Sequence, residues 1–380
     1  MNKRSFKKET ILVHIEDPGA ANGLLPVSKK LLETGYNVEL DLEGFAKNIK
    51  DEDLGSLIKA KNSFKNLEEN KYEALITGTS ENTNSNSFAL IEKCRILGIP
   101  TFAFIDSPAN SENRFSGGGS NPLKYAPNFL FVVDESIVSD FKRFGFISSN
   151  MLCIEHPHLE TLFLKKQKIT KASKSDLKRN LFDSSFDGKP ILTFCSELSS
   201  GLDPDGYKKT EEYTLHSPKN LLNRTDVVVH NLIEAVNILN CKKDISPIRA
   251  ILRLHPKQEK EEIKLFNKFD FISKDESSID VCLASDLIIG MTSMIMVEAF
   301  ELGLPVISIL PREKEINWMH RSIRNKIPIC TNFTDLLKEL ESFLDNLSSE
   351  TAKDAPSNDY APRDFTYIDF ITDNIRDFAK

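Results

Sequence analysis

The chain has 380 residues, of which 49 are lysine or arginine and 56 are aspartate or glutamate, giving a formal net charge of −7. An acidic balance excludes a general nucleic-acid binder, because such proteins gain most of their affinity by neutralising phosphates. A local basic pocket stays compatible with this charge. The length exceeds one ordinary core and predicts two domains.

The amino terminus, MNKRSFKKET, is basic and leads directly into the short apolar run ILVHI. We therefore expect neither a signal peptide nor a membrane span, and a cytoplasmic protein. Peripheral contact with the inner face of a membrane through the basic residues 3–8 is left open. The six cysteines are scattered without a Cys-x-x-Cys pair, which predicts reduced core cysteines and no metal site.

In the first part of the chain, apolar runs of strand length alternate with amphipathic helical stretches, a rhythm typical of parallel sheets with crossover helices. The helical stretches are LLPVSKKLLETG, SFALIEKCRILG and SIVSDFKRFG. In two of them the final glycine comes just before the next expected strand, where helices commonly end. The expected strands are 11–15, 36–41, 74–77, 100–105, 129–133 and 151–154. We assign residues 1–165 to the first domain.

Residues 166–188 are rich in lysine and serine and lose strand character, which predicts a linker. The second domain then covers 189–345, with a long helix near 224–240, and residues 346–380 form a polar segment and a helix that packs back on the first domain. The expected strands of the second domain are 190–195, 248–254, 269–272, 286–290 and 305–310. The fold class is thus α/β, with two Rossmann-like doubly wound parallel-sheet domains facing a cleft, where ligands bind at the carboxyl ends of strands.

The stretch HIEDPGAANG follows the first expected strand. Glu16 and Asp17 offer a general base close to a helix start, and small residues such as Gly19, with Asn22 one turn on, let a ligand come near the backbone. Asp17 as a simple helix cap and Glu16 as a solvated side chain remain the alternative.

The stretch LRLHPKQ ends a strand of the second domain. Strand alternation puts Arg253 and His255 on one side, while Pro256 ends the strand and stiffens the turn. Together with Lys257 these residues predict a rim that binds a phosphate or a carboxylate and includes a group that titrates near neutrality. A surface histidine in a turn is the alternative.

The stretch DLIIGMTSMIMVEAFELG leads from a buried strand, ending at Gly290 and Met291, into an apolar helix. Thr292 and Ser293 lie where backbone N–H groups of a helix start point outward, which predicts a phosphate site. Glu298 is the one charged residue among apolar neighbours, so we expect it to have a specific partner such as a ribose diol or a cation, or else a salt bridge.

Taken together, these stretches resemble the GT-B class of glycosyltransferases, in particular bacterial sialyltransferases, polysialyltransferases and transferases of Kdo and other nonulosonic acids. The motifs that carry the resemblance come in the same order and are Glu16-Asp17 with Gly19, then His255-Pro256, then Thr292-Ser293. Pro18 before the glycine departs from the pattern, so either Glu16 or Asp17 can hold the position of the base. We prefer Asp17 because it is nearer the turn.

The resemblance implies an amino-terminal acceptor domain, a carboxy-terminal donor domain and transfer of a sialic-like sugar from a CMP-sugar to a hydroxyl of a surface glycan, without metal or other cofactor. It implies that Asp17 takes the acceptor proton and that His255 contacts the departing phosphate. Thr292 and Ser293 would hold that phosphate, with positive charge from Arg253 and Lys257 and with Glu298 on the ribose. Asn110 and Arg114, in a loop after a strand, are the expected acceptor contacts.

Other functions fit the same pattern. The first is a transferase of the same fold that uses CDP-glycerol or a UDP-sugar. The second is an isomerase of the UDP-sugar 2-epimerase type, which ranks lower because it needs several carboxylates around the sugar and the clear acidic pair is only at 16 and 17. The third is a noncatalytic sugar-nucleotide binder.

Overall fold

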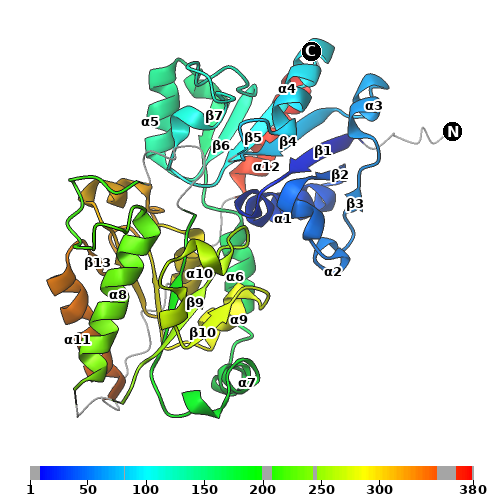
Figure 1. Ribbon diagram of the computed structural model, residues 1–380. Coiled ribbons are helices and arrows are strands. Elements are labelled where there is room, and N and C mark those ends of the chain that lie inside the picture. Colours follow the sequence, from blue (N-terminus) through cyan, green and yellow to red (C-terminus); the bar gives the residue numbers. More distant parts are fainter. Residues whose placement is uncertain (1–8, 81, 199–207, 243–245, 349–364, 379–380) are drawn as a thin grey trace. The chain divides into compact units, whose positions relative to one another are not determined.

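The computed structural model describes residues 9–80, 82–198, 208–242, 246–348 and 365–378, and the chain divides into two compact units (Figure 1). Unit 1 comprises Met1–Thr161 with Ala361–Lys380, and unit 2 comprises Leu162–Tyr360. The basic residues 3–8 and most of the polar segment after residue 345 lie outside the described residues.

Unit 1 contains a sheet of seven parallel strands in the order β3-β2-β1-β4-β5-β6-β7, the order of a doubly wound fold. The strands are β1 (Thr10–Ile15), β2 (Asn37–Leu42), β3 (Ile58–Lys59), β4 (Ala74–Gly78), β5 (Thr101–Ile105), β6 (Phe129–Val132) and β7 (Met151–Cys153). Side chains alternate along β1, so Ile11 and Val13 pack in one apolar cluster and Leu12 packs in another. Both faces of the sheet are therefore covered by helices.

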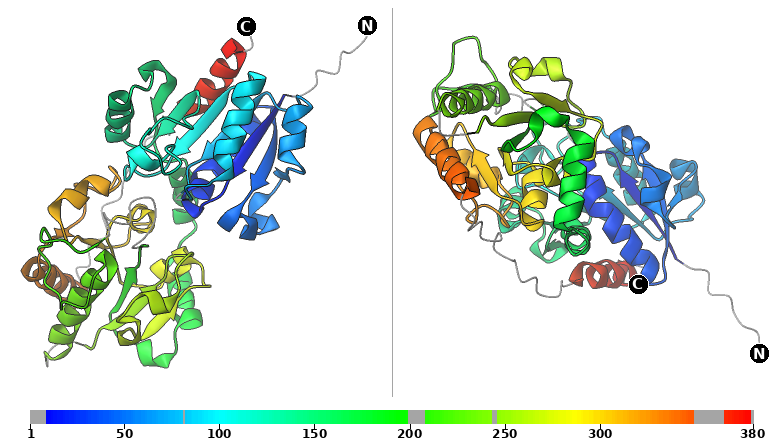
Figure 2. Two further views of the ribbon diagram at one scale, coloured as in Figure 1. Left: turned by 45° about the horizontal axis from the view of Figure 1, so that its top comes forward. Right: turned by 90° about the horizontal axis from the view of Figure 1, so that it is seen from below.

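The helices of unit 1 begin and end at residues suited to those positions. Asp134 caps the start of one helix by accepting a hydrogen bond from the backbone N–H of Ser136, and Gly145 ends the same helix in the left-handed conformation. Gly98 ends another helix in the same conformation. The last helix lies beside the first one, as Figure 2 shows. These helices are α1 (Pro18–Glu33), α2 (Asp51–Leu54), α3 (Ser63–Glu68), α4 (Asn86–Leu97), α5 (Glu135–Phe144) and α12 (Thr366–Phe378), while α6 (His158–Lys166) crosses from unit 1 to unit 2.

Unit 2 contains a sheet of six parallel strands in the order β10-β9-β8-β11-β12-β13. Its strands are β8 (Ile191–Cys195), β9 (Arg249–Arg253), β10 (Phe271–Ser273), β11 (Leu287–Gly290), β12 (Val306–Ile309) and β13 (Ile329–Cys330). Its helices are α7 (Lys171–Leu181), α8 (Arg224–Asn240), α9 (Ser278–Leu283), α10 (Met294–Glu301) and α11 (Phe333–Ser348). Helices α8 and α11 lie side by side (Figure 1).

The segment 166–188, expected to be a linker, is instead mostly structured within unit 2. It contains α7, and Leu177 and Phe182 pack with Ile191 and Ile251 of the second sheet. The composition is polar because one side of α7 faces water, while its apolar residues meet the sheet. Tertiary packing, which composition does not reveal, turns this segment into part of the domain.

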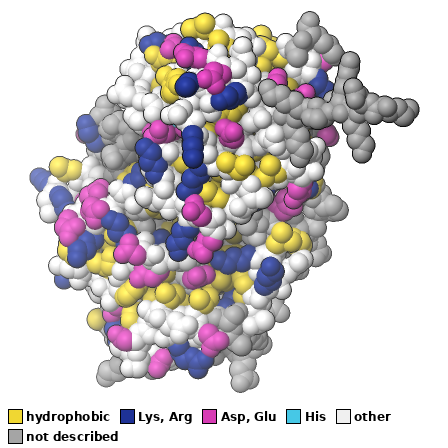
Figure 3. All heavy atoms as spheres, turned by 90° about the vertical axis from the view of Figure 1, so that its right-hand side faces the viewer, with side chains coloured by type: hydrophobic (Ala, Val, Ile, Leu, Met, Phe, Trp, Pro, Cys, Tyr) yellow, Lys and Arg dark blue, Asp and Glu magenta, His cyan; other side chains and the backbone are white. Residues whose placement is uncertain are grey.

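The surface carries both signs of charge. On the face that Figure 3 shows, lysine and arginine side chains are interspersed with aspartate and glutamate side chains. All six cysteines are free. Among the helices of the described residues, none is both long and apolar enough to cross a membrane.

Candidate functional site

In unit 1, polar side chains gather after the carboxyl ends of β1, β4 and β5. Glu16 follows β1, and its Oε1 accepts a hydrogen bond from Asn82 Nδ2 at 3.0 Å while its Oε2 accepts one from Ser85 Oγ at 2.5 Å. Gly44 lies against it with a positive φ of 50°, and a Cβ there would be 3.0 Å from Glu16 Cγ. Hydrogen bonds from Asn82 and Ser85 thus fix the orientation of the Glu16 carboxylate.

His14, at the end of β1, is part of an internal pair. Its Nδ1 lies 2.8 Å from Asp41 Oδ2, and the histidine is 1% exposed. Burial alone would raise the pKa of Asp41, but the hydrogen bond and charge of His14 outweigh burial, so this pKa lies below its ordinary value. This pair links β1 to β2.

Asp17 is the N-cap residue of α1, with extended backbone angles, and its side chain makes no cap hydrogen bond among the described residues. Pro18 occupies the first turn, where its missing N–H costs nothing. Asp17 therefore takes the backbone position of a helix cap, as the alternative expected, but its carboxylate does not act as the cap.

Asp106 is a carboxylate that the sequence motifs did not single out. It follows β5 and lies over the start of α1, where a Cβ on Gly19 would come within 1.9 Å of its Oδ2. Burial raises the pKa of Asp106 above its ordinary value. Arg114, whose Nη1 lies 3.8 Å from Asp106 Oδ1, opposes that shift, and the negative charge of Asp17 adds to it. Gly19 is thus the residue that lets this carboxylate approach the helix start.

The expected acceptor contacts have distinct surroundings. Asn22 is half-buried on α1, and Asn110 adopts the left-handed conformation at φ 60°. Arg114 is 8% exposed, and it donates from Nη2 to the Ala109 carbonyl at 2.9 Å and from Nη1 to Thr79 Oγ1 at 3.1 Å. Arg114 therefore holds the loop after β5 in shape, and through that loop it positions Asp106.

In unit 2, Glu197 stands two residues beyond β8 and reaches the start of α10. Its Oε2 accepts hydrogen bonds from Thr292 Oγ1 at 2.9 Å and Arg224 Nη1 at 2.7 Å, and the backbone N–H of Thr292 donates to its Oε1. Burial alone would raise the pKa of Glu197, but Arg224 and the bonds from Thr292 outweigh it and hold this pKa below its ordinary value. The hydroxyl and N–H of Thr292, expected to meet a phosphate, thus both bind an ionised carboxylate instead.

Arg224 and Arg312 share a second carboxylate, Glu315, with Trp318 beside them. Arg224 Nε donates to Glu315 Oε2, and Arg312 Nε donates to Glu315 Oε1 at 2.7 Å. Glu315 is 0% exposed and both guanidiniums lie near the Trp318 ring, at 5.6 and 5.5 Å from its centroid. Burial alone would lower the pKa of Arg224, but Glu197 and Glu315 raise it. Two guanidiniums and two carboxylates thus balance in charge, and we call Arg224, Arg312, Glu197 and Glu315 the buried ion cluster.

Ser293 is the N-cap residue of α10, yet its side chain makes no cap hydrogen bond. Its Oγ is buried and has no hydrogen-bond partner in the part of the chain that the structure describes. Buried hydroxyls are nearly always satisfied, so this one requires an explanation such as a ligand. By contrast, Met291 is a core residue at 0% exposure, and Gly290 is needed because a Cβ there would be 2.7 Å from Met296 Sδ.

The turn after β9 holds His255 in a defined orientation. The backbone N–H of Lys257 donates to His255 Nδ1 at 3.2 Å, and the backbone N–H of His255 donates to Ser196 Oγ at 3.1 Å. Because Nδ1 accepts a hydrogen bond, a neutral His255 carries its proton on Nε2. Pro256 and Lys257 are exposed.

Arg253 and Glu298, both expected to contact the nucleotide, are largely buried. Arg253 is 8% exposed, its Nη1 donates to Ser273 Oγ at 2.9 Å and lies 4.0 Å from Glu276 Oε2. Burial lowers the pKa of Arg253. Its guanidinium therefore joins β9 to the end of β10, and Glu298 is 5% exposed on α10.

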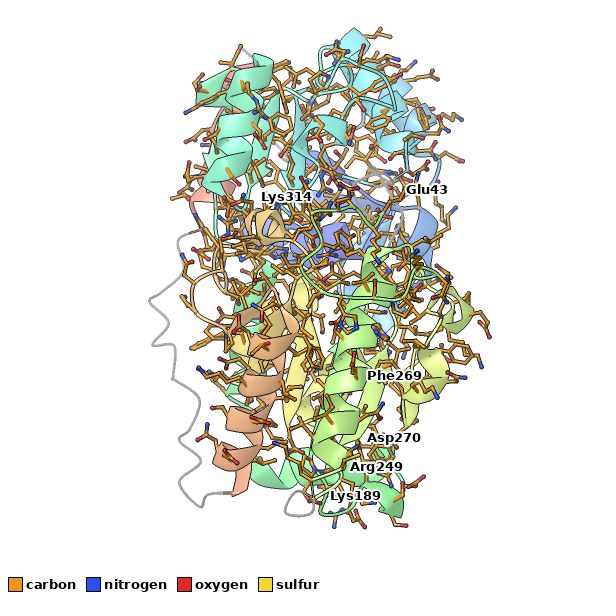
Figure 4. All side chains as sticks on the ribbon, turned by 60° about the vertical axis from the view of Figure 1, so that its left-hand side comes forward. Glu43, Lys189, Arg249, Phe269, Asp270 and Lys314 are labelled. Atoms are coloured by element: carbon orange, nitrogen blue, oxygen red, sulfur yellow. The ribbon has the colours of Figure 1, made fainter. Side chains whose placement is uncertain are left out.

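At the amino ends of the strands of the second sheet, the charged residues are more exposed than those of the buried ion cluster at the carboxyl ends. Arg249 begins β9, and its Nη1 lies 2.6 Å from Oδ1 of Asp270, the residue before β10. Figure 4 labels both residues with Lys189, which precedes β8. This ion pair is partly exposed, whereas Arg224 and Glu315 of the buried ion cluster are 1% and 0% exposed.

No protein-family model and no curated protein sequence matches the chain. Its structure is similar to HepE from Anabaena in complex with UDP-glucose, at 15% identity and a TM-score of 0.59 over 92% of this chain and 93% of that one. It is also similar to UDP-GlcNAc 2-epimerase from Neisseria meningitidis bound to UDP-GlcNAc, at 13% identity and a TM-score of 0.61 over 97% and 100%. A third similar structure is the wall teichoic acid polymerase TagF, at 14% identity and a TM-score of 0.55 over 97% and 89%.

The fold is of the GT-B type. The two-domain α/β architecture expected from the sequence is confirmed, with each sheet in doubly wound order. Sequence reasoning missed Asp106, Glu197, Arg224 and Glu315. Asp106 and Glu197 both follow buried strands, β5 and β8, and that position is the signal that could have found them.

Proposed function

We propose that the protein is a glycosyltransferase that uses a pyrimidine nucleotide sugar, whose phosphate binds at the start of α10 in unit 2. The observation that carries this proposal is the buried, unsatisfied hydroxyl of Ser293 at that helix start. Helix starts favour anions through their outward N–H groups and the helix dipole. A phosphate oxygen could accept a hydrogen bond from the Ser293 hydroxyl and would also be favoured by the N–H groups at the start of α10.

The buried ion cluster has a supporting role in this proposal. Because Glu197 binds the N–H and hydroxyl of Thr292, contact with the phosphate falls to Ser293 and the first turn of α10. The cluster balances its own charges, so the charge of a phosphate would be met by the helix start and by Lys257 and His255 of the neighbouring turn. Glu298, five residues after Ser293 on the same helix and thus about 7.5 Å further along its axis, is the proposed ribose contact.

His255 is the proposed acid that stabilises the leaving phosphate. Its Nδ1 accepts the Lys257 N–H, so the proton that it can donate sits on Nε2. The second bond of the turn, from the His255 N–H to Ser196 Oγ, holds the backbone in place. A fixed imidazole with a defined tautomer is what general acid catalysis needs.

We propose that carboxylates of unit 1 act on the hydroxyl of the sugar acceptor. Asp17 is the proposed base, because Glu16 is committed to hydrogen bonds with Asn82 and Ser85. Asp106, whose pKa is raised by burial and by Asp17, is the second carboxylate able to hold a proton there. Asp17 and Asp106 thus place two carboxylates near the start of α1.

The donor is the finer part of the proposal. The similar structures from Anabaena and Neisseria meningitidis contain UDP-sugars, which favours a UDP-sugar. The alternative donor, the CMP-sugar of a nonulosonic acid, is supported only by the order of the acidic, His-Pro and Thr-Ser motifs along the sequence. The interacting pair of Asp17 and Asp106 also favours a second candidate function, epimerisation of a UDP-sugar, because that reaction uses several carboxylates around one sugar ring.

The test is incubation with UDP-glucose, UDP-GlcNAc or the CMP-sugar of a nonulosonic acid, followed by mass spectrometry of the nucleotide and the sugar. A transferase releases UDP or CMP, slowly to water and faster with its acceptor, and His255→Ala should lower that release by about 100-fold. The matched control Lys260→Ala, an exposed charge in the same loop, should leave it unchanged. Conversion of the sugar without nucleotide release would mean an epimerase, and binding without either would contradict both activities.

A further inference from the structure

Unit 2 contains a cluster of two histidines and a carboxylate away from the start of α10. His230 and Glu234 lie one turn apart on α8, and His216 comes from the preceding loop. Helical residues at this spacing project from the same face. Within the described ranges, this is the one group of three histidine, cysteine, aspartate or glutamate side chains whose ligand atoms converge.

The distances suit a shared ion. Glu234 Oε2 lies 3.8 Å from His216 Nε2 and 3.7 Å from His230 Nε2, and all three ligand atoms are within 4.8 Å of one another. Tetrahedral zinc with bonds of about 2.0–2.1 Å places its ligand atoms roughly 3.3 Å apart. Small rotations of the side chains therefore close the set around one ion.

Glu234 Oε2 is left without a hydrogen bond. This oxygen is buried and has no hydrogen-bond partner within the described residues, although the two imidazole nitrogens face it. A buried carboxylate oxygen with no donor is costly. A cation between Glu234, His216 and His230 would satisfy it.

The loop ligand is held in place by its neighbours. Asn231, which is 0% exposed, donates from Nδ2 to the His216 carbonyl at 2.7 Å. The His216 ring packs edge-on against Phe333, with centroids 6.4 Å apart, and against His230 at 5.5 Å. The backbone and the ring of His216 are thus preorganised toward α8, which reduces the entropy that a ligand set must lose on binding.

We propose that His216, His230 and Glu234 form a binding site for a divalent transition metal of the zinc type. Two imidazoles and one carboxylate are a ligand set of zinc sites, with a fourth position open to water. Magnesium and calcium prefer all-oxygen ligands, so neither suits this set. The prediction of no metal site rested on the scattered cysteines and did not consider these two histidines and Glu234.

The metal ties a loop to α8. The ends of this loop meet at the bridge of Lys208 with Asn223, and Thr214 Oγ1 donates to the carbonyl of Pro311 at 3.1 Å. The same loop carries Tyr213, whose ring lies 5.1 Å from the guanidinium of Arg312 in the buried ion cluster. Metal binding therefore stabilises one wall of the region around that cluster.

The experiment is titration of the full-length, tag-free protein with Zn²⁺ by calorimetry, with amide hydrogen exchange of residues 208–223 as a second readout. We expect one equivalent to bind and to slow exchange in this loop. His230→Ala and Glu234→Gln should each weaken the binding by on the order of 100-fold and abolish the slower exchange. Mg²⁺ and Ca²⁺ should show neither effect.

Two control variants separate this site from adventitious binding. Cys241→Ser removes the exposed free thiol at the end of α8, and Glu341→Gln removes a carboxylate from the neighbouring helix α11. Both should bind Zn²⁺ as the wild type does. Binding lost in Cys241→Ser, or kept in His230→Ala and Glu234→Gln with folded protein by circular dichroism, would overturn the proposal.

Discussion

Replacing Glu315 with glutamine should destabilise unit 2 strongly, because Glu315 is the carboxylate between Arg224 and Arg312 at 0% exposure. The substitution keeps the shape of the side chain but removes its charge. Two buried guanidiniums then face the single carboxylate of Glu197. Leaving a buried charge uncompensated is the most damaging change that this cluster offers.

The size of the effect follows from that geometry. Removing one partner of a buried ion pair costs about 3–5 kcal/mol. For a domain of the size of unit 2, 1 kcal/mol shifts Tm by roughly 2–4 °C. These values give a fall in the Tm of unit 2 of roughly 6–20 °C. We expect a fall in the lower half of this range, because the amide of glutamine still accepts one hydrogen bond.

The assay uses the only tryptophan of the chain, Trp318, which lies beside both guanidiniums. Its fluorescence reports unfolding of unit 2, and calorimetry on the same samples reports both units. The matched control is Glu313→Gln, an exposed glutamate two residues earlier, which should change stability by less than about 0.5 kcal/mol. Equal Tm values for the two variants would refute the assigned role of the cluster.

Three further predictions concern carboxylates and one glycine. Asp106→Asn should raise Tm at neutral pH and lower transfer, since the raised pKa means that the folded state loses stability as pH rises through that pKa; an unchanged or lower Tm would contradict it. The pKa of Glu197 is lower in the folded protein, so its charge stabilises the fold above the ordinary glutamate pKa, and this stability is lost as the pH falls through the lowered value. Glu197→Gln should lower Tm at neutral pH and should show a smaller fall of Tm on acidification than the wild type. Parallel curves of Tm against pH for the two proteins would count against this role. Gly19→Ala should displace the Asp106 carboxylate, since its Cβ would come within 1.9 Å of Oδ2. We expect at least a tenfold loss of transfer with a Tm near that of the wild type, and full activity would mean that this approach is not needed.

The strands were largely predictable because parallel strands buried on both faces read as continuous apolar runs. The expected helix near 224–240 corresponds to Arg224–Asn240, which begins after the capping residue Asn223. The strands β3 and β13 were missed. Each has only two residues, at the edge of its sheet, and such lengths carry no periodic signal.

Candidate site residues could be chosen from the sequence only where their place along the chain, directly after a strand, marks them. Ser293 and His255 come directly after buried strands, in turns with typical residues, and could be chosen from the sequence. The contacts of Glu197 could not, because its partners Thr292 and Arg224 are 95 and 27 residues away along the chain. Such pairings arise only when the parallel strands bring their ends together.

The central claim, a nucleotide phosphate at the start of α10, is tested most directly by calorimetric titration of UDP and CMP into the wild type and Ser293→Ala. We expect one binding site in the wild type, and binding that is roughly 10- to 100-fold weaker in Ser293→Ala, which loses one hydrogen bond to a charged group. Ser149→Ala, an exposed serine of unit 1, should bind like the wild type. No binding of either nucleotide, or equal binding by wild type and Ser293→Ala, would contradict the claim.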